Sequence, residues 1–191
     1  MKGIRKKSIL EAAERCIISH GIEGVTMRSI ASEAGINLAS LHYYFENKEN
    51  LLTSLINQKF MDYGSKFSES LSNVDSPAEQ IRSVVNYLGK TIVEDRNTYI
   101  LLFEYLPSAS RNPKIRDLLR TSYGEFRTSL TYLLDKSLKE RGKSGVDSRI
   151  LSSFIIGLID GMWIQLFLDE GAFDVEKYVD QINILIEEKT A

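Results

Sequence analysis

The stretch from Thr26 to Lys48 constrains the fold of this 191-residue chain more than any other stretch. Its first part has the three-and-four-residue spacing of one apolar helix face, at Met27, Ile30, Ala31 and Ala34. Thr26 precedes this face and can cap the helix, and Gly35 is suited to the left-handed backbone that ends a helix. A second apolar spacing follows at Leu38, Leu41 and Phe45. Two short helices joined at a glycine are typical of a helix-turn-helix.

The outer side of the second helix carries hydrogen-bonding groups on short or flat side chains, at Ser40, His42, Tyr43 and Tyr44. Such groups can reach phosphates or base edges when a helix lies in the major groove of DNA. The alternative is structural: Tyr43 and Tyr44 are half-buried core residues with their hydroxyls at the surface.

This stretch resembles the N-terminal signature of TetR-family transcriptional regulators. The matching residues are Thr26, Ile30-Ala31, Ala34-Gly35-Ile36, the run from Leu41 to Phe45, and Lys48-Glu49. The sequence departs from the family pattern at Leu38, often polar or basic, at Ala39, often glycine, and at His42, most often tyrosine. The resemblance implies a three-helix DNA-binding domain, residues 1–47, followed by a helical ligand-binding and dimerisation domain, residues 48–191. It also implies DNA contacts by Thr26, Arg28, Asn37, Leu38, Ala39, Ser40, His42, Tyr43, Tyr44 and Lys48.

Within that set, we expect Lys48, Tyr43, Tyr44 and Thr26 mainly to hold phosphates, and Asn37, Leu38, Ala39 and Ser40 to face base edges. Residues 1–48 contain seven Lys/Arg and five Glu, so a mildly basic head precedes an acidic remainder. This distribution fits nucleic-acid contact at one end of the chain.

Helical apolar spacing continues to the end of the chain and predicts an all-α fold of about nine helices. Beyond the two short helices, we expect helices at 2–20, 48–71, 77–92, 98–106, 113–141, 148–168 and 175–187. Gly21 should end the first helix and Pro107 the sixth, while Ser76-Pro77-Ala78-Glu79 has the form of a capping box with proline at the first helical position.

Catalysis, metal binding and export are poorly supported by the composition. Two histidines leave few general bases, and His20 is better explained by a helix end. The single cysteine, Cys16, excludes an internal disulfide and lies on an apolar stripe. No metal-ligand spacing or phosphate-binding glycine loop is present, so we expect no enzyme, metal or cofactor. The apolar run 150–168 is interrupted by Asp160 and Gln165, which favours a core helix over a membrane span. No signal peptide is evident, and a cytoplasmic protein is expected.

The helix predicted at 148–168 is apolar nearly all round and therefore needs cover on every side. In the TetR family the last two helices commonly form a four-helix dimer interface, which implies a homodimer here. The predicted interface residues are Gly157, Gly161, Ile164, Val179, Ile182 and Ile186. Tight packing within one subunit is the alternative for the two glycines. The run from Leu158 to Trp163 resembles the choline-responsive, BetI-type branch of the family.

The leading function is a homodimeric repressor that leaves a palindromic operator when a small molecule binds. Residues predicted to bind that inducer are Phe60, Tyr63, Phe67, Tyr87, Phe103, Tyr123, Phe126, Asp160 and Trp163. Asp160 either has a structural hydrogen bond to a neighbouring helix or across the dimer, or it binds a cation beside an aromatic ring. Two further alternatives are a helical body that binds a protein partner and no small ligand, and a hydrolase hidden in that body.

Overall fold

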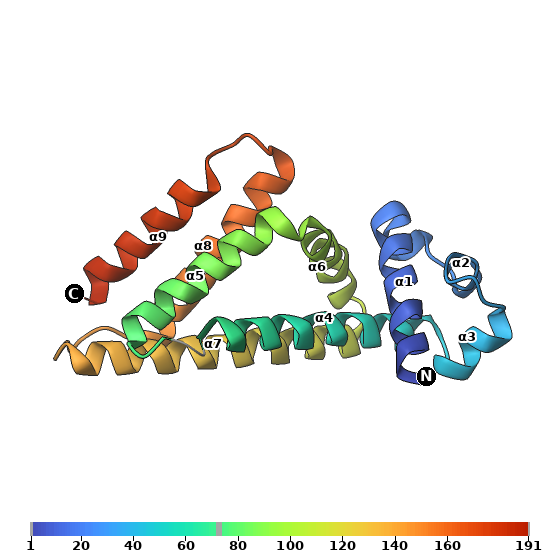
Figure 1. Cartoon of the computed structure of the whole chain (residues 1–191), viewed down its shortest axis with the longest axis horizontal. Coiled ribbons are helices and arrows are strands. Elements are labelled where there is room, and N and C mark those ends of the chain that lie inside the picture. Colours follow the sequence, from blue (N-terminus) through green and yellow to red (C-terminus); the bar gives the residue numbers. More distant parts are fainter. Residues whose placement is uncertain (1, 72–73, 191) are drawn as a thin grey trace. The chain divides into compact units, whose positions relative to one another are not determined.

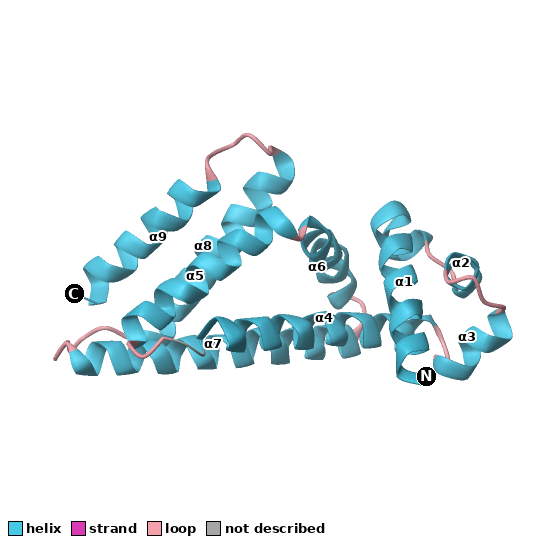
Figure 2. Cartoon of the chain, in the orientation of Figure 1, coloured by secondary structure: helices cyan, strands magenta, loops and turns pink. Residues whose placement is uncertain are grey.

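The computed structural model describes residues 2–71 and 74–190, which form nine helices and no strand (Figures 1 and 2). The predicted all-α fold is confirmed. The helices are α1 (Lys2–Gly24), α2 (Met27–Glu33), α3 (Leu38–Tyr44), α4 (Lys48–Leu71), α5 (Pro77–Glu94), α6 (Arg96–Ala109), α7 (Pro113–Glu140), α8 (Ser148–Leu168) and α9 (Val175–Thr190).

Packing divides the chain into two compact units. Unit 1 comprises residues 1–63 and 97–120, and unit 2 comprises residues 64–96 and 121–191. Helices α4 and α7 each supply residues to both units. Unit 1 contains 12 Lys/Arg and 9 Asp/Glu, against 12 and 17 in unit 2. Unit 1 therefore carries the positive excess. The predicted boundary at residues 47 and 48 coincides with the beginning of α4 and remains a prediction about domains.

The core of unit 1 is built where α1, α2 and α3 bring their apolar faces together. Ile9, Ile17, Ile30 and Leu41 are fully buried, and Phe45 closes the core after α3. Ion pairs hold the outside of this bundle: Arg15 Nε lies 2.7 Å from Glu33, and Lys59 Nζ lies 2.5 Å from Glu14. Cys16 is buried in the same core, and burial raises the pKa of its thiol. These contacts leave the outer side of α3 free of core packing.

Local signals set most helix ends of unit 1. Thr26 caps α2 through a reciprocal capping box, in which its hydroxyl accepts from the Ser29 N–H and Ser29 Oγ accepts from the Thr26 N–H, each at 3.0 Å. Gly21 leaves the helical conformation with φ of 69°, as its predicted role as a helix end requires. A short helical turn continues α1 to Gly24, four residues past the predicted end.

One predicted helix end was wrong, and one predicted helix start, that of α5 at Pro77, was right but lacks the expected side-chain cap. Helix α6 continues through Pro107 to Ala109. Pro107 lies in the last turn, so the one backbone hydrogen bond that its missing N–H removes is close to the end of the helix. Ser108 Oγ donates to Glu104 O at 3.2 Å in the same turn. Ser76 is the N-cap of α5 but makes no side-chain capping bond. Instead, Gln80 Nε2 donates to Val74 O at 2.7 Å and holds the chain before α5.

In unit 2, α5 and α9 pack closely and α8 packs against both. Gly89 of α5 allows this approach, because a Cβ atom there would lie 2.3 Å from Val179 Cγ2 of α9. Asn183 is buried in the same layer and donates to Asn86 Oδ1 at 2.9 Å. The buried face of α9 is thus directed at its own chain.

Helix α8 is the one helix in the described part of the chain that is long and apolar enough to cross a membrane. A single helix of this kind is weak support for a membrane span. Its inward face, which includes Ile155, Ile159 and Met162, is buried within unit 2, whereas Phe154 and Leu168 are 64% and 77% exposed. The expected core helix therefore has one apolar face without cover.

Candidate functional site

The outer face of α3 is accessible, as DNA binding requires. Tyr43 is 68% exposed, and Ala39 and His42 are also exposed. Tyr44 is half-buried, and its ring meets that of Tyr43 edge-on with centroids 5.2 Å apart. Of the helix itself, Leu41 alone is fully buried. The alternative that these tyrosines are half-buried core residues therefore applies to Tyr44 and not to Tyr43.

Several side chains predicted to touch DNA also hold the helix-turn-helix in shape. Asn37 Oδ1 caps α3 by accepting from the Ser40 N–H at 2.7 Å. His42 Nδ1 lies 3.2 Å from Glu46 O. The Thr26 hydroxyl is used in the capping box of α2. Leu38 is half-buried, and Arg28 is exposed. Among the residues predicted to face base edges, Leu38, Ala39 and Ser40 are therefore the ones whose side chains form no cap of a helix.

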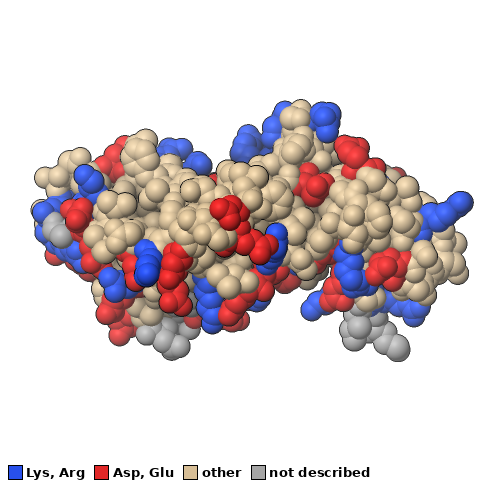
Figure 3. Space-filling view, turned by 90° about the horizontal axis from the view of Figure 1, so that it is seen from above, with Lys and Arg blue, Asp and Glu red and all other residues tan. Residues whose placement is uncertain are grey.

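Cations border this surface. Lys48 is the first residue of α4 and half-buried, and Arg5, Lys6 and Lys7 are exposed on α1. The Lys6 Nζ lies 5.5 Å from the centre of the Phe45 ring, directly after α3. On the face drawn in Figure 3, Lys and Arg are interspersed with Asp and Glu.

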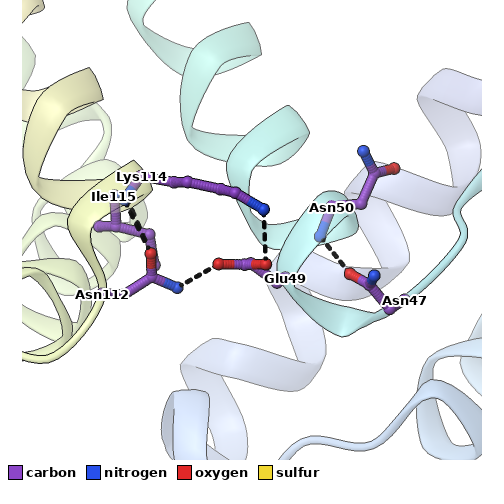
Figure 4. Close-up of polar contacts among 6 residues, drawn as sticks. All are labelled: Asn47, Glu49, Asn50, Asn112, Lys114 and Ile115. Carbon is purple, nitrogen blue, oxygen red and sulfur yellow. Dashed lines mark hydrogen bonds and ion pairs between the residues drawn. The ribbon is translucent and has the colours of Figure 1, made fainter.

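Glu49, next to Lys48, fixes the beginning of α4 (Figure 4). Its carboxylate accepts from Asn112 Nδ2 and from Lys114 Nζ, each at 3.0 Å. These hydrogen bonds, from Lys114 first, lower the pKa of Glu49. Asn112 Oδ1 in turn caps α7 by accepting from the N–H groups of Lys114 and Ile115. No local sequence pattern connects residue 49 with residue 112.

A second candidate site lies in unit 2, between α7 and α8. Tyr123 donates from its hydroxyl to Asp160 Oδ1 at 3.4 Å. Burial raises the pKa of Asp160 to about 6, against an ordinary value of 3.8, although the Tyr123 hydrogen bond opposes the increase. Burial, and then the charge of Asp160, raises the pKa of Tyr123, so the phenol stays protonated. No cation of the described residues forms an ion pair with Asp160.

Other aromatic side chains predicted to bind the ligand also belong to unit 2. Trp163 follows one turn later on α8 and is buried. Phe126, one turn from Tyr123 on α7, meets Phe67 of α4 edge-on at 5.6 Å between ring centroids. Tyr87 of α5 is half-buried in unit 2, and burial raises the pKa of its hydroxyl. Unit 2 thus contains six of the nine predicted ligand residues.

The other three predicted ligand residues, Phe60, Tyr63 and Phe103, belong to unit 1 and are half-buried there. Tyr63 OH forms a hydrogen bond of 2.7 Å with Tyr99 OH. Tyr99 was missed because its place in the apolar spacing of α6 indicated only core packing.

Half of the predicted dimer residues lie inside the chain. Val179, Ile182 and Ile186 are at most 7% exposed on the face of α9 that is directed at its own chain. Gly157, Gly161 and Ile164 lie instead on the uncovered side of α8. Their spacing continues to exposed apolar residues at Ile150, Phe154 and Leu168. Within residues 2–71 and 74–190, no group of three or more His, Cys, Asp or Glu side chains could hold a metal ion.

Comparison with known proteins agrees with this architecture. Residues 9–55 match the family model "Bacterial regulatory proteins, tetR family", and residues 77–190 match "BetI-type transcriptional repressor, C-terminal". The nicotine-responsive transcriptional repressor HdnoR of Paenarthrobacter nicotinovorans is 30% identical over 169 residues, covering 86% of this chain and 84% of that protein. The regulator BetI of Agrobacterium fabrum is 27% identical over 165 residues, covering 86% and 78%.

Two solved structures show the same fold with different ligands. A Saccharomonospora viridis protein in complex with choline superposes with a TM-score of 0.86 at 24% identity, covering 98% of this chain and 97% of that one. FadR of Bacillus subtilis in complex with stearoyl-CoA gives 0.82 at 22% identity, covering 94% and 96%. The fold alone therefore does not determine the ligand. With both parts of the chain matched, the protein belongs to the TetR family of bacterial regulatory proteins and has a BetI-type C-terminal region.

Proposed function

We propose that this TetR-family regulator is a cytoplasmic, homodimeric repressor that an organic cation releases from a palindromic operator. The observation that carries the ligand class is Asp160, a largely buried carboxylate whose hydrogen bond in the described structure comes from the neutral phenol of Tyr123. A buried carboxylate without a counter-charge costs free energy. A bound cation would remove that cost.

Aromatic rings near Asp160 support the same ligand class. Tyr123 contacts the carboxylate, and Trp163 lies one turn away on α8. Ring faces attract organic cations, and desolvation strengthens the attraction. The relative that is 30% identical is named as nicotine-responsive, and nicotine carries a basic amine.

On the DNA side, α3 would enter the major groove with Leu38, Ala39 and Ser40 toward base edges. Lys48 and Tyr43 would hold phosphates, with Thr26 and Asn37 as capping residues that can also reach DNA. Phosphate contacts position such a helix, and the few base contacts specify the sequence. The apolar atoms of Leu38 and Ala39 suit the methyl group of thymine.

The dimer would form through the uncovered face of α8. Beyond the neighbouring backbone of α8, no described residue lies within 4 Å of a Cβ atom built at Gly157 or Gly161, so both glycines leave room for a second helix. Exposed Phe154 and Ile164 continue this face. From α9 the exposed Ile184 and Leu185 would join it, in place of Val179, Ile182 and Ile186. A two-fold axis would make the contact isologous.

Helix α4 is the proposed link between ligand and DNA. It begins at Lys48 and also carries Phe67, whose ring packs on Phe126 near Tyr123. Half-sites one turn apart require recognition helices about 34–36 Å apart. A displacement of α4 by a few ångström would therefore be sufficient to weaken binding.

The test is a DNA-binding titration on an operator selected from random duplexes by the full chain. Choline serves as the probe cation, because its charge is permanent. We expect a palindromic site, two chains per site, and release by choline. Asp160→Asn should bind the operator but not respond, whereas the matched control Asp180→Asn, an exposed carboxylate of α9, should respond as wild type does. Operator binding that no organic cation changes would favour a body that binds a protein partner instead.

A further inference from the structure

Helices α7 and α8 are antiparallel, and three side-chain hydrogen bonds define their register. From one bonded pair to the next, the residue on α7 moves back by four or eight positions, and the residue on α8 moves forward by the same number. The pairs are Asp135 with Ser148, Thr131 with Ser152 at 3.0 Å, and Tyr123 with Asp160 at 3.4 Å.

One position in this series has no polar partner. The register places Arg127 opposite Ile156, which is buried. Arg127 also lies in the inward spacing of α7 that continues to the buried Leu130 and Leu134. Its Nε is buried and has no hydrogen-bond acceptor among the described residues, nor does the guanidinium form an ion pair with any of them. Arg127 is half-buried, and a carboxylate beside it would give this buried Nε–H the hydrogen-bond acceptor that it lacks.

Arg127 and Asp160 therefore carry opposite charges along the line where α7 packs on α8, which we call the seam. Tyr123 and Arg127 are four residues apart on α7. The position of Arg127 therefore lies about one helical turn, about 6 Å, from the Tyr123–Asp160 pair. The two side chains form no ion pair with each other, and Asp160 has a neutral partner in Tyr123. Neither charge has a charged partner among the described residues, and one ligand with both charges would complement them together.

Resting on the proposed function, in which Asp160 binds a cation, we propose that the ligand is a zwitterion whose carboxylate binds Arg127. The ammonium group lies at Asp160 and Tyr123, and the carboxylate forms paired hydrogen bonds with the guanidinium. The ligand class is an amino- or trimethylammonio-carboxylate with about three methylene groups between its charges, since such a chain spans about 5 Å when extended. Choline, which lacks the carboxylate, would use half of the site.

The experiment compares 4-(trimethylammonio)butanoate with its methyl ester. The two molecules share the cation, and the ester lacks the negative charge. Binding to the full chain is followed by the fluorescence of Trp163, the one tryptophan of the sequence, on the same helix as Asp160. Wild type should bind the acid at least about tenfold more tightly than the ester, as expected for a hydrogen-bonded charge pair.

Three variants locate the effect. Arg127→Gln should weaken binding of the acid to the level of the ester. Lys136→Gln, which removes an exposed cation further along α7, should keep the tenfold preference. Asp160→Asn should weaken both compounds. Thermal unfolding gives a separate readout: Arg127→Met removes an unpaired charge from an apolar seam and should raise Tm or leave it unchanged.

Equal affinity of wild type for acid and ester would overturn the zwitterion proposal and leave the cation site intact. The same conclusion would follow if Arg127→Gln kept the preference, or if Arg127→Met lowered Tm by more than about 4 °C, which would assign Arg127 a structural role. Failure of both compounds to bind would overturn the zwitterion proposal and the proposed cation function together.

Discussion

Replacing Asp160 by asparagine should change the pH dependence of stability in a defined direction. Burial raises the pKa of Asp160 in the folded chain to about 6, from 3.8. Folding therefore favours the protonated form, and the free energy of unfolding falls as pH rises from about 4 to about 6. The difference between the two pKa values corresponds to about 3 kcal/mol, and solvent that still reaches the side chain reduces this to about 2 kcal/mol.

Asparagine has the same shape without the charge and can still accept from Tyr123. Without ligand, Asp160→Asn should be more stable than wild type by about 2 kcal/mol at pH 8. The two proteins should be equally stable at about pH 2.5, more than one pH unit below both pKa values, where the carboxyl group is protonated in the folded and the unfolded chain. Urea unfolding at several pH values measures both quantities. If the difference in the free energy of unfolding between Asp160→Asn and wild type did not change with pH, the raised pKa of Asp160 would be refuted. A variant less stable than wild type at pH 8 would refute it as well.

Four further outcomes are expected. Lys48→Ala should weaken binding to all DNA sequences alike and reduce the salt slope by about one counterion, which titrations at several salt concentrations measure; loss confined to the operator would make Lys48 a base reader. Replacing thymine by uracil opposite Leu38 should weaken binding by about 1 kcal/mol, and less than about 0.3 kcal/mol at every half-site position would exclude a methyl contact. Gly157→Leu should give monomers in sedimentation with lower operator affinity; intact dimers would place the interface elsewhere. Gly64→Ala, at a helical position with nothing within 4 Å of the new Cβ, should raise the free energy of unfolding by about 0.5–1 kcal/mol, and a decrease in urea unfolding would contradict that reason.

The features that the sequence predicts well are those that neighbouring residues determine. The apolar spacing of α2 and α3, the Thr26 cap and the change of direction at Gly21 all depend on contacts within one or two turns. Pro107 shows the limit of such signals. A proline ends a helix only when the lost hydrogen bond is not offset, and that depends on its place in the last turn.

Features that depend on which elements pack together are not determined locally. The spacing of Val179, Ile182 and Ile186 predicts an apolar face of α9, but it does not say whether that face meets α5 or a second chain. The close approach at Gly89 settles this in the folded chain. Arg127 was missed for a related reason: a charge in an apolar spacing is usually a solvated residue, and only the register of α7 and α8 shows that it faces Ile156.

The same distinction applies to the ligand residues. Tyr123 and Asp160 lie 37 residues apart, and their pairing follows from the antiparallel packing of two long helices. Asp160 was recognised from sequence because a carboxylate in the most apolar helix must have a partner. The identity of that partner required the structure.

In the proposed function, an organic cation and operator DNA each weaken the binding of the other to the same protein. Linkage makes this measurable, since the factor by which one ligand weakens the other must be the same in both directions. The affinity of choline is therefore measured with and without saturating operator, and the affinity of the operator with and without saturating choline. The account predicts two equal ratios above about five, the lower end of common allosteric coupling. Choline that binds equally well to free and operator-bound protein would contradict it.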